Sequence, residues 1–217
     1  MLAYLNDPTL KTFILKELSS HRKLDAIVKG TYWYYGKGCA VGCTLESVAR
    51  RNGKWKQGIN HQDHALYESE LGIPKQLAHL QDAIFEGLPD PDFKLWPAQF
   101  AKAVKPGSDL SGVWPKFVVA LLTDPLGPVW PHVQDAKWHQ QLTAIEQVAC
   151  LFKNGIPAES AARSAAWSAA SAAWSAAWSA ESAESAARSA ASAESAAWSA
   201  AYQWQRDILI KLLRAAK

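Results

Sequence analysis

The chain has 217 residues, enough for one sizeable domain with or without an extension. Its hydrophobic content of 49% and charged content of 20% are typical of a folded protein and exclude an intrinsically disordered chain. The formal net charge of +3 is small and gives no strong signal for a nucleic-acid partner or a membrane surface.

Three cysteines occur in the chain, Cys39, Cys43 and Cys150. An odd number of cysteines without a dense framework is typical of a protein from a reducing compartment. The first residues, MLAYLNDPTLK, contain an early aspartate and proline and do not resemble a secretory leader. No run of 18 apolar residues is free of serine and charge, so we expect no membrane span. These features predict a cytoplasmic protein.

The first 155 residues form a series of helical patterns separated by glycine and proline. Asp7 and Pro8 are a typical helix start, and apolar residues recur every three or four positions after them. No pair of strands with alternating polarity and a hairpin turn stands out. The sequence predicts an all-α fold, with a helical body over 1–155 and a long Ala/Ser-rich helix over 156–217. Further helices in the body are expected over about 21–29, 39–51, 61–70, 74–87, 93–105, 113–122 and 135–153.

Cysteine and histidine pairs follow one another in the body with the pattern C-x3-C-x17-H-x2-H. Cys39 and Cys43 lie four positions apart, and His61 and His64 lie three apart, so each pair shares one helical face. Two thiolates and two imidazoles are a tetrahedral ligand set for zinc. The first interpretation of these residues is therefore a structural zinc site.

A second interpretation makes Cys39 a catalytic nucleophile. The glycines before Cys39 would place it at the start of a helix, where amides and the helix dipole lower a thiol pKa. His64 or His61 would then be the base, and Glu68 or Asp63 would orient that base. This interpretation predicts a cysteine-dependent enzyme that acts on an acyl group or a similar electrophile.

A third interpretation gives these residues no chemistry. Both cysteines would be small core residues, Gly42 would allow close packing, and the histidines would be polar surface or capping groups. The sequence leaves the three interpretations open.

Aromatic and basic residues gather in the segments TYWYYGKG and RRNGKWK. Such residues can stack on a planar group or meet a phosphate, although a solvated loop has the same composition. The candidate residues for a small anionic ligand are Trp33, Tyr35, Lys37, Arg50, Arg51 and Tyr67.

Twelve serines between Ser160 and Ser199 follow one another at steps of three or four, and each is followed by alanine. The eleven steps cover 39 residues, about 3.5 residues per step, which is close to the roughly 3.6 residues of a helical turn. The serines therefore lie near one line along a helix, and their small side chains would let another backbone approach closely. A low-complexity tail without a fixed partner is the alternative.

Tryptophans accompany this serine stripe and are poorly suited to a solvated tail. We therefore expect the long helix to pack against another copy of the chain or against a partner helix. The expected interface residues are Ser164, Ser168, Ser171, Ser175, Ser179, Trp167, Trp174, Trp178 and Trp198.

The segments GKGCAVGCT, HALYESELGIP and DAIFEGLP resemble those of a family of bacterial and phage proteins whose members often carry similar Ser-Ala-Ala-rich C-terminal stretches. The resemblance covers most of the chain from about Gly30 onward. It implies no activity, but it implies a phage-borne or mobile-element accessory role, such as interference with host defence. It marks Cys39, Cys43, His64, Tyr67 and Glu68 as candidate site residues.

The leading hypothesis is a non-enzymatic binding protein that takes a small anionic ligand or a host protein and assembles through its C-terminal helix. The serine stripe and the tryptophans suit contact better than reaction. A cysteine-dependent enzyme and a structural oligomeric scaffold are the alternatives.

Overall fold

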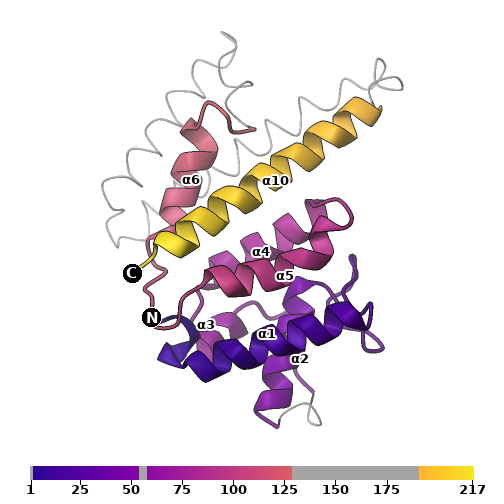
Figure 1. Ribbon diagram of the computed structural model, residues 1–217, viewed down its shortest axis with the longest axis vertical. Helices are drawn as coiled ribbons and strands as arrows, with labels where there is room; N and C mark the ends of the chain where they lie inside the picture. Colours follow the sequence, from indigo (N-terminus) through magenta and orange to yellow (C-terminus); the bar gives the residue numbers. More distant parts are fainter. Residues whose placement is uncertain (1, 54–57, 129–190) are drawn as a thin grey trace. The chain divides into compact units, whose positions relative to one another are not determined.

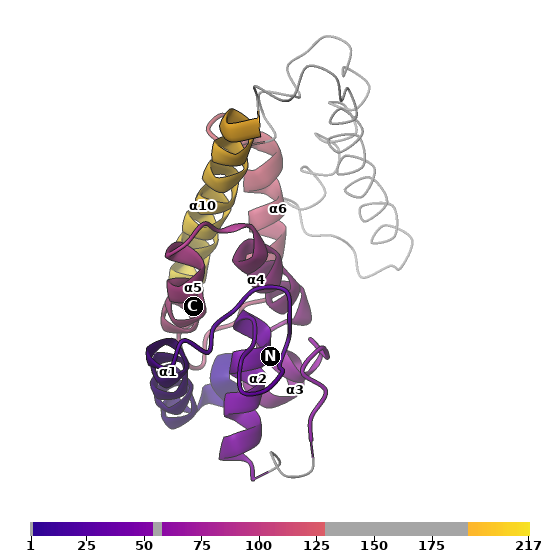
Figure 2. The same ribbon diagram turned by 90° about the vertical axis from the view of Figure 1, so that its right-hand side faces the viewer.

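The computed structural model describes residues 2–53, 58–128 and 191–217 (Figures 1 and 2). Within these ranges the regular elements are all helical and strand pairing is limited to isolated bridges, so the predicted all-α fold is confirmed. The elements are η1 (Ala3–Asn6), α1 (Pro8–Lys23), α2 (Ala40–Arg51), α3 (Leu66–Leu71), α4 (Lys75–Gly87), α5 (Asp92–Ala103), α6 (Val113–Thr123) and α10 (Ala191–Ala215).

The chain divides into two compact units. The first contains Met1–Trp114 together with Gln205–Lys217, and the second contains Pro115–Trp204. The predicted helix over 135–153 and the predicted long helix before Ala191 lie outside the described residues. The described part of the long helix is α10, which is helical from Ala191 to Ala215. No helix in the described ranges is both long enough and apolar enough to cross a membrane.

Helix α1 begins where the sequence predicts. The Asp7 carboxylate accepts a hydrogen bond from the Thr9 amide at 2.7 Å, and Pro8 occupies the first turn. The separate helix expected over 21–29 is wrong, because α1 itself continues to Lys23. Asp25 then adopts a left-handed backbone with φ of 52°, which a helix cannot contain.

The core of the first unit forms where α1 packs against α2 and α5, and α4 packs against the same two helices (Figures 1 and 2). Large apolar side chains fill the space between them, and their burial supplies the main stabilisation. The largest fully buried side chains of this unit include Trp96, Tyr4, Tyr67, Phe85 and Phe100.

Lysines from other segments close the C-terminal ends of two core helices. Lys11 Nζ donates to the carbonyls of Lys102 and Val104 at the end of α5, at 2.8 and 2.7 Å. Lys29 donates in the same way to the carbonyls of Glu86 and Leu88 at the end of α4. Each ammonium meets carbonyls without intrahelical partners at the negative end of a helix dipole.

The last residues of α10 belong to the first unit. Leu209 and Leu213 are fully buried, and Arg206 forms a 2.7 Å ion pair with Asp92 at the start of α5. The amide of Asp109 donates to the carbonyl of Lys217 at 2.7 Å. The end of the chain is thus fixed beside the segment that follows α5.

Candidate functional site

The segment GKGCAVGC forms the start of α2, as the sequence predicts. Cys39 is the N-cap residue, and its Sγ accepts a hydrogen bond from the Gly42 amide at 3.4 Å. Gly38 and Gly42 both face the backbone carbonyl of Tyr32, where a Cβ on either glycine would overlap that oxygen. The prediction that Gly42 allows close packing is confirmed.

The thiol of Cys39 is not activated by its helix position. The side chain is only 2% exposed, and burial raises the pKa of the Cys39 thiol, with a further rise from the Asp82 carboxylate beside it. The amides of Gly42 and Val41 oppose this rise without overcoming it. The expected lowering of the thiol pKa is therefore wrong, because desolvation outweighs the helix terminus.

The thiol of Cys43 lies deeper still. It is fully buried, donates to the carbonyl of Gly38 at 3.3 Å, and has its pKa raised to about 12 by burial. Cys43 thus behaves as a small core residue.

His64 lies in a buried polar cluster that the sequence reveals only in part. It is 7% exposed, and its Nε2 lies 3.5 Å from Asp82 Oδ2. Its ring stacks on His79 with centroids 3.9 Å apart, and burial, followed by the nearby charge of His64, lowers the pKa of His79. The carboxylate beside His64 is that of Asp82. Burial raises the pKa of Tyr32 to about 12, and the charge of Asp82 adds to this rise.

The acidic residues that sequence spacing favoured have other partners. Glu68 Oε1 accepts a hydrogen bond from the Lys75 amide at 3.0 Å and so caps the start of α4. The Asp63 carboxylate accepts from the Ala65 amide. Asp82 could not be foreseen, because it follows His64 by a full helix and a turn. The only signal was its position three residues after His79 on one helical face.

His61 belongs to a different contact group. Its Nε2 lies 3.2 Å from Glu46 Oε2, and its ring stacks on Trp33 with centroids 5.7 Å apart. Trp33 also forms an edge-to-face ring pair with His21, which is buried near Ser47. His61 and His64 therefore have separate partners.

The four predicted zinc ligands do not form a ligand set in this arrangement. Cys43 faces a backbone carbonyl and His61 faces Glu46, while Cys39 and His64 both lie near Asp82. Among the described residues, no group of three or more histidine, cysteine or acidic side chains is arranged to hold a metal ion. Zinc remains a prediction for metal analysis of the purified protein.

The residues predicted to bind an anion are not all brought together, and several are occupied by other partners. Arg50 pairs with Glu46 at 2.8 Å, and Arg51 pairs with Asp7 at 2.8 Å. Tyr67 is fully buried and donates through its hydroxyl to Gln81 Oε1 at 2.9 Å.

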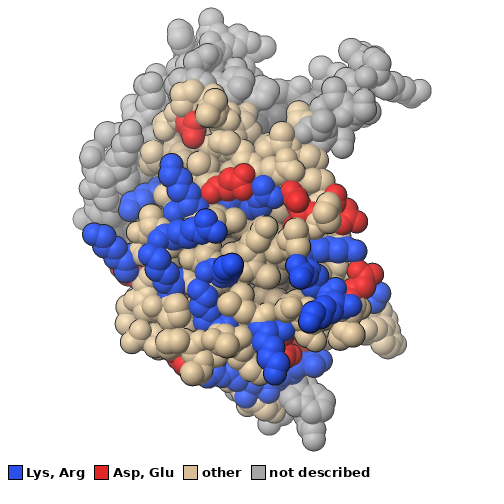
Figure 3. All heavy atoms as spheres, in the orientation of Figure 1, with Lys and Arg blue, Asp and Glu red and all other residues tan. Residues whose placement is uncertain are grey.

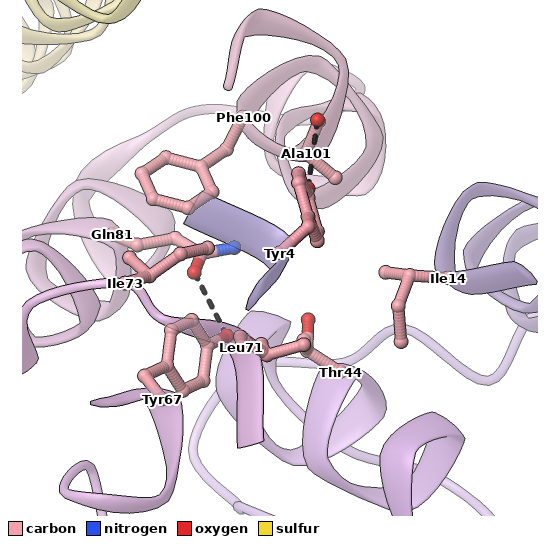
Figure 4. A pocket seen from close by; sticks show the side chains of 9 residues that line it. All are labelled: Tyr4, Ile14, Thr44, Tyr67, Leu71, Ile73, Gln81, Phe100 and Ala101. Atoms are coloured by element: carbon pink, nitrogen blue, oxygen red, sulfur yellow. Dashed lines mark hydrogen bonds between the residues drawn. The ribbon is translucent and has the colours of Figure 1, made fainter. Parts of the chain in front are cut away.

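The cavity beside Tyr67 is too small for an organic ligand. It has a volume of about 10 Å³, room for no more than one water molecule. Figure 4 shows that side chains from several helices close around it and that the Tyr4 and Tyr67 hydroxyls are both used in hydrogen bonds. Its lining residues are Tyr4, Ile14, Thr44, Tyr67, Leu71, Ile73, Gln81, Phe100 and Ala101.

Two of the predicted ligand residues stand in solvent on a tight turn, which we call the tyrosine turn (34–37). Tyr34 and Lys37 exchange both backbone hydrogen bonds, at 2.8 and 3.0 Å, and Tyr35 and Gly36 both have positive φ, at 46° and 78°. This is the geometry of a type I′ turn, which Asn-Gly usually fills. A tyrosine at Tyr35 costs on the order of 1 kcal/mol of backbone strain.

The tyrosine turn displays apolar surface. Tyr34 is 66% exposed and Tyr35 is 87% exposed, and their rings form an edge-to-face pair 4.3 Å apart. The turn is held near the end of α1, because Gly38 bonds to Ala26 and Val28 through its backbone. Leu24, at that end of α1, is 73% exposed.

A second feature emerges only from the fold. Lysine and arginine side chains from three segments far apart in sequence gather over α1, the end of α5 and the end of α10, with few acidic side chains between them (Figure 3). None of these cations except Lys11 and Lys105 has a hydrogen bond or ion pair to another described residue. We call this set the basic face: Lys11, Lys102, Lys105, Lys211, Arg214 and Lys217.

The contacts of the basic face join its members. Lys11 donates to the Lys102 carbonyl, and burial together with the charge of Lys102 lowers the pKa of Lys11. Lys105 donates to the Ala216 carbonyl at 3.5 Å. The sequence held two separate signals, the pair Lys102 and Lys105 and the cations of the segment KLLRAAK, and only the fold brings these two segments together.

Most of the predicted helix interface lies outside the described residues, namely Ser164, Ser168, Ser171, Ser175, Ser179, Trp167, Trp174 and Trp178. Trp198 is described, is partly exposed, and stacks on Tyr202 one turn later with centroids 6.1 Å apart. The interface therefore remains a prediction.

Comparison of the chain with protein-family models, with curated proteins and with solved structures finds no match.

Proposed function

We propose that this protein acts by binding an anionic partner and not by catalysing a reaction. The observation that carries the proposal is the basic face, whose exposed lysines and arginine are not neutralised by acidic side chains among the described residues. Such a surface attracts anions over a Debye length and speeds their association. The tyrosine turn, near the other end of α1, adds exposed aromatic area, which is typical of binding surfaces.

The state of Cys39 supports the choice of binding over catalysis. A cysteine nucleophile must be available as a thiolate near neutral pH, and burial together with Asp82 favours the protonated thiol. The alternative of a cysteine-dependent enzyme therefore lacks an activated nucleophile.

The proposal includes the wider setting predicted from the sequence. The resemblance to phage-borne proteins supports interference with host defence, with a host macromolecule or a small anion as the partner. The free thiols of Cys39 and Cys43 support a reducing, cytoplasmic compartment. The serine stripe supports assembly of copies through the C-terminal helix. A purely structural scaffold would need no basic face.

Anisotropy of fluorescently labelled polyglutamate and inorganic polyphosphate, titrated with the full chain, tests the proposal. We expect at least one polyanion to bind and the affinity to fall as salt rises. The triple variant Lys102→Gln, Lys211→Gln, Arg214→Gln should bind about tenfold or more weakly. Lys75→Gln removes an exposed cation at the start of α4 and should bind like the parent chain. Failure of both polyanions to bind would overturn the proposal.

A further inference from the structure

The basic face and the tyrosine turn lie at opposite ends of one exposed helix surface. Five exposed residues of α1 recur at steps of three or four, and we call them the α1 stripe: Thr9, Thr12, Lys16, Ser20 and Lys23. At about 1.5 Å per residue, the stripe runs for roughly 21 Å. Its members are neutral hydroxyls or lysines, and the one carboxylate bonded to a member, that of Asp7 on Thr9, is paired with Arg51.

One end of the stripe lies in the same turns of α1 as Lys11, a member of the basic face. Lys11, in the first turns of α1, contacts the carbonyls of Lys102 and Val104. The end of α10 lies beside the same segment, because Lys105 and Asp109 both bond to its last residues. The cations of α5 and α10 therefore gather beside the first turns of α1, where the α1 stripe begins.

The other end of the stripe meets the tyrosine turn. Arg22, Lys23 and Leu24 are exposed at the end of α1. Asp25 follows Leu24, and the hydrogen bond from Lys94 lowers the pKa of its carboxyl. The charge of Lys37 in the tyrosine turn lowers the pKa of Asp25 further, so Lys37 lies near the end of α1. Four acidic groups lie near this line: Asp7, which pairs with Arg51, half-buried Glu17, Asp25, which pairs with Lys94, and exposed Asp109, which is turned toward Ser111.

We infer that a single-stranded nucleic acid lies along this track, with its bases stacked on the tyrosine turn and its phosphates over the α1 stripe and the basic face. The inference rests on the proposed function and names the anionic partner. Proteins that bind single strands combine a line of cations with exposed aromatic rings, and this arrangement has both. A duplex would leave the rings unused, because its bases are already stacked on one another.

The backbone strain at Tyr35 favours the same partner. A tyrosine held at positive φ next to a second exposed tyrosine gains nothing from burial in the free protein, since both rings face solvent. Strain of this kind is retained where it places a side chain for contact. A flat ring open to solvent suits a nucleobase, which offers a π-face whatever its sequence.

The test uses the full chain and a labelled oligo(dT) of about 12 nucleotides, with binding measured by anisotropy at about 50 and 200 mM salt. We expect binding that weakens with salt. The double variant Tyr34→Ser, Tyr35→Ser should bind about tenfold or more weakly, while Tyr34→Phe, Tyr35→Phe keeps the rings and the affinity. Lys16→Gln with Lys102→Gln should weaken binding and lower the salt dependence, and Lys75→Gln is the matched control.

The outcomes separate the inference from the proposed function. Binding of polyglutamate or polyphosphate without binding of oligo(dT) overturns the inference and leaves the proposed function intact. Oligo(dT) binding that the serine variants do not weaken, or equal binding of a duplex of the same length, also overturns the stacking inference. Tighter binding of polyglutamate than of oligo(dT) assigns the track to an acidic protein instead. Absence of binding to every polyanion overturns both.

Discussion

At the scale of single residues, two glycines decide how the segment around Cys39 is built. Gly42 lies inside α2, where glycine lowers helix stability relative to alanine. Its position against the Tyr32 carbonyl explains why glycine is nevertheless present, since any Cβ would overlap that oxygen. The contact joins the start of α2 to the aromatic loop and so fixes the base of the tyrosine turn.

Gly42→Ala should therefore destabilise the protein strongly, although alanine is the better helix former. We expect a loss of about 3 kcal/mol in the free energy of unfolding, because backbone on both sides must move. Urea unfolding followed by circular dichroism measures this change. Gly53→Ala is the control, with positive φ but open space around the added Cβ, and should cost about 1 kcal/mol. An equal or smaller loss at Gly42 would contradict the packing argument.

The buried thiol of Cys39 leads to a prediction on reactivity. Iodoacetamide reacts with the thiolate, and burial together with Asp82 keeps Cys39 protonated and covered. Near neutral pH, alkylation of Cys39 in the folded chain should be on the order of tenfold or more slower than that of a cysteine in a short peptide. Mass spectrometry of the digested protein locates the adduct. Unfolding in urea should bring the rate up to the peptide value, whereas faster labelling in the folded chain would restore the enzyme hypothesis.

At the scale of elements, the helices that the sequence predicted well are those with local signals. Asp7 and Pro8 fix the start of α1, and the pattern after Cys39 fixes α2, because capping and periodicity act within a few residues. The expected helix over 61–70 shortens to Leu66–Leu71. Just before this helix, the side chains of Asn60 and Asp63 accept hydrogen bonds from nearby backbone amides. The turns that these bonds form compete with a helix.

The ends of α4 and α5 depend on lysines that no local pattern links to them. Lys11→Met keeps most of the aliphatic stem but removes both hydrogen bonds to the α5 carbonyls. We expect a loss of about 1 to 2 kcal/mol in the free energy of unfolding, measured in urea. Lys16→Met on the same helix removes an exposed ammonium with no hydrogen bond to a described residue, and should change stability by less than about 0.5 kcal/mol. Similar losses in the two variants would mean that Lys11 does not cap α5.

At the scale of the whole molecule, the amino-acid composition does not reveal the basic face on which the proposal depends. The net charge of +3 is the sum of basic and acidic residues that the fold separates, so an average over the chain gives no sign of the basic face. For the same reason, the sequence predicted only part of the candidate site. Tyr35 and Lys37 lie in one short segment, while Lys105 and the end of the chain meet only after the chain folds.

The long C-terminal helix carries the last prediction, on assembly. The sequence predicts that the serine stripe would let a second helix approach closely and that the tryptophans beside it would supply area to bury. Size-exclusion chromatography with light scattering should therefore give the full chain a mass above the 23.8 kDa of one copy. The variant Trp167→Ser, Trp174→Ser, Trp178→Ser should shift that mass toward a single copy while leaving the helical body folded. A parent chain that elutes as a clean monomer at all concentrations would remove assembly from the proposal, and binding by the basic face would then have to act through single copies.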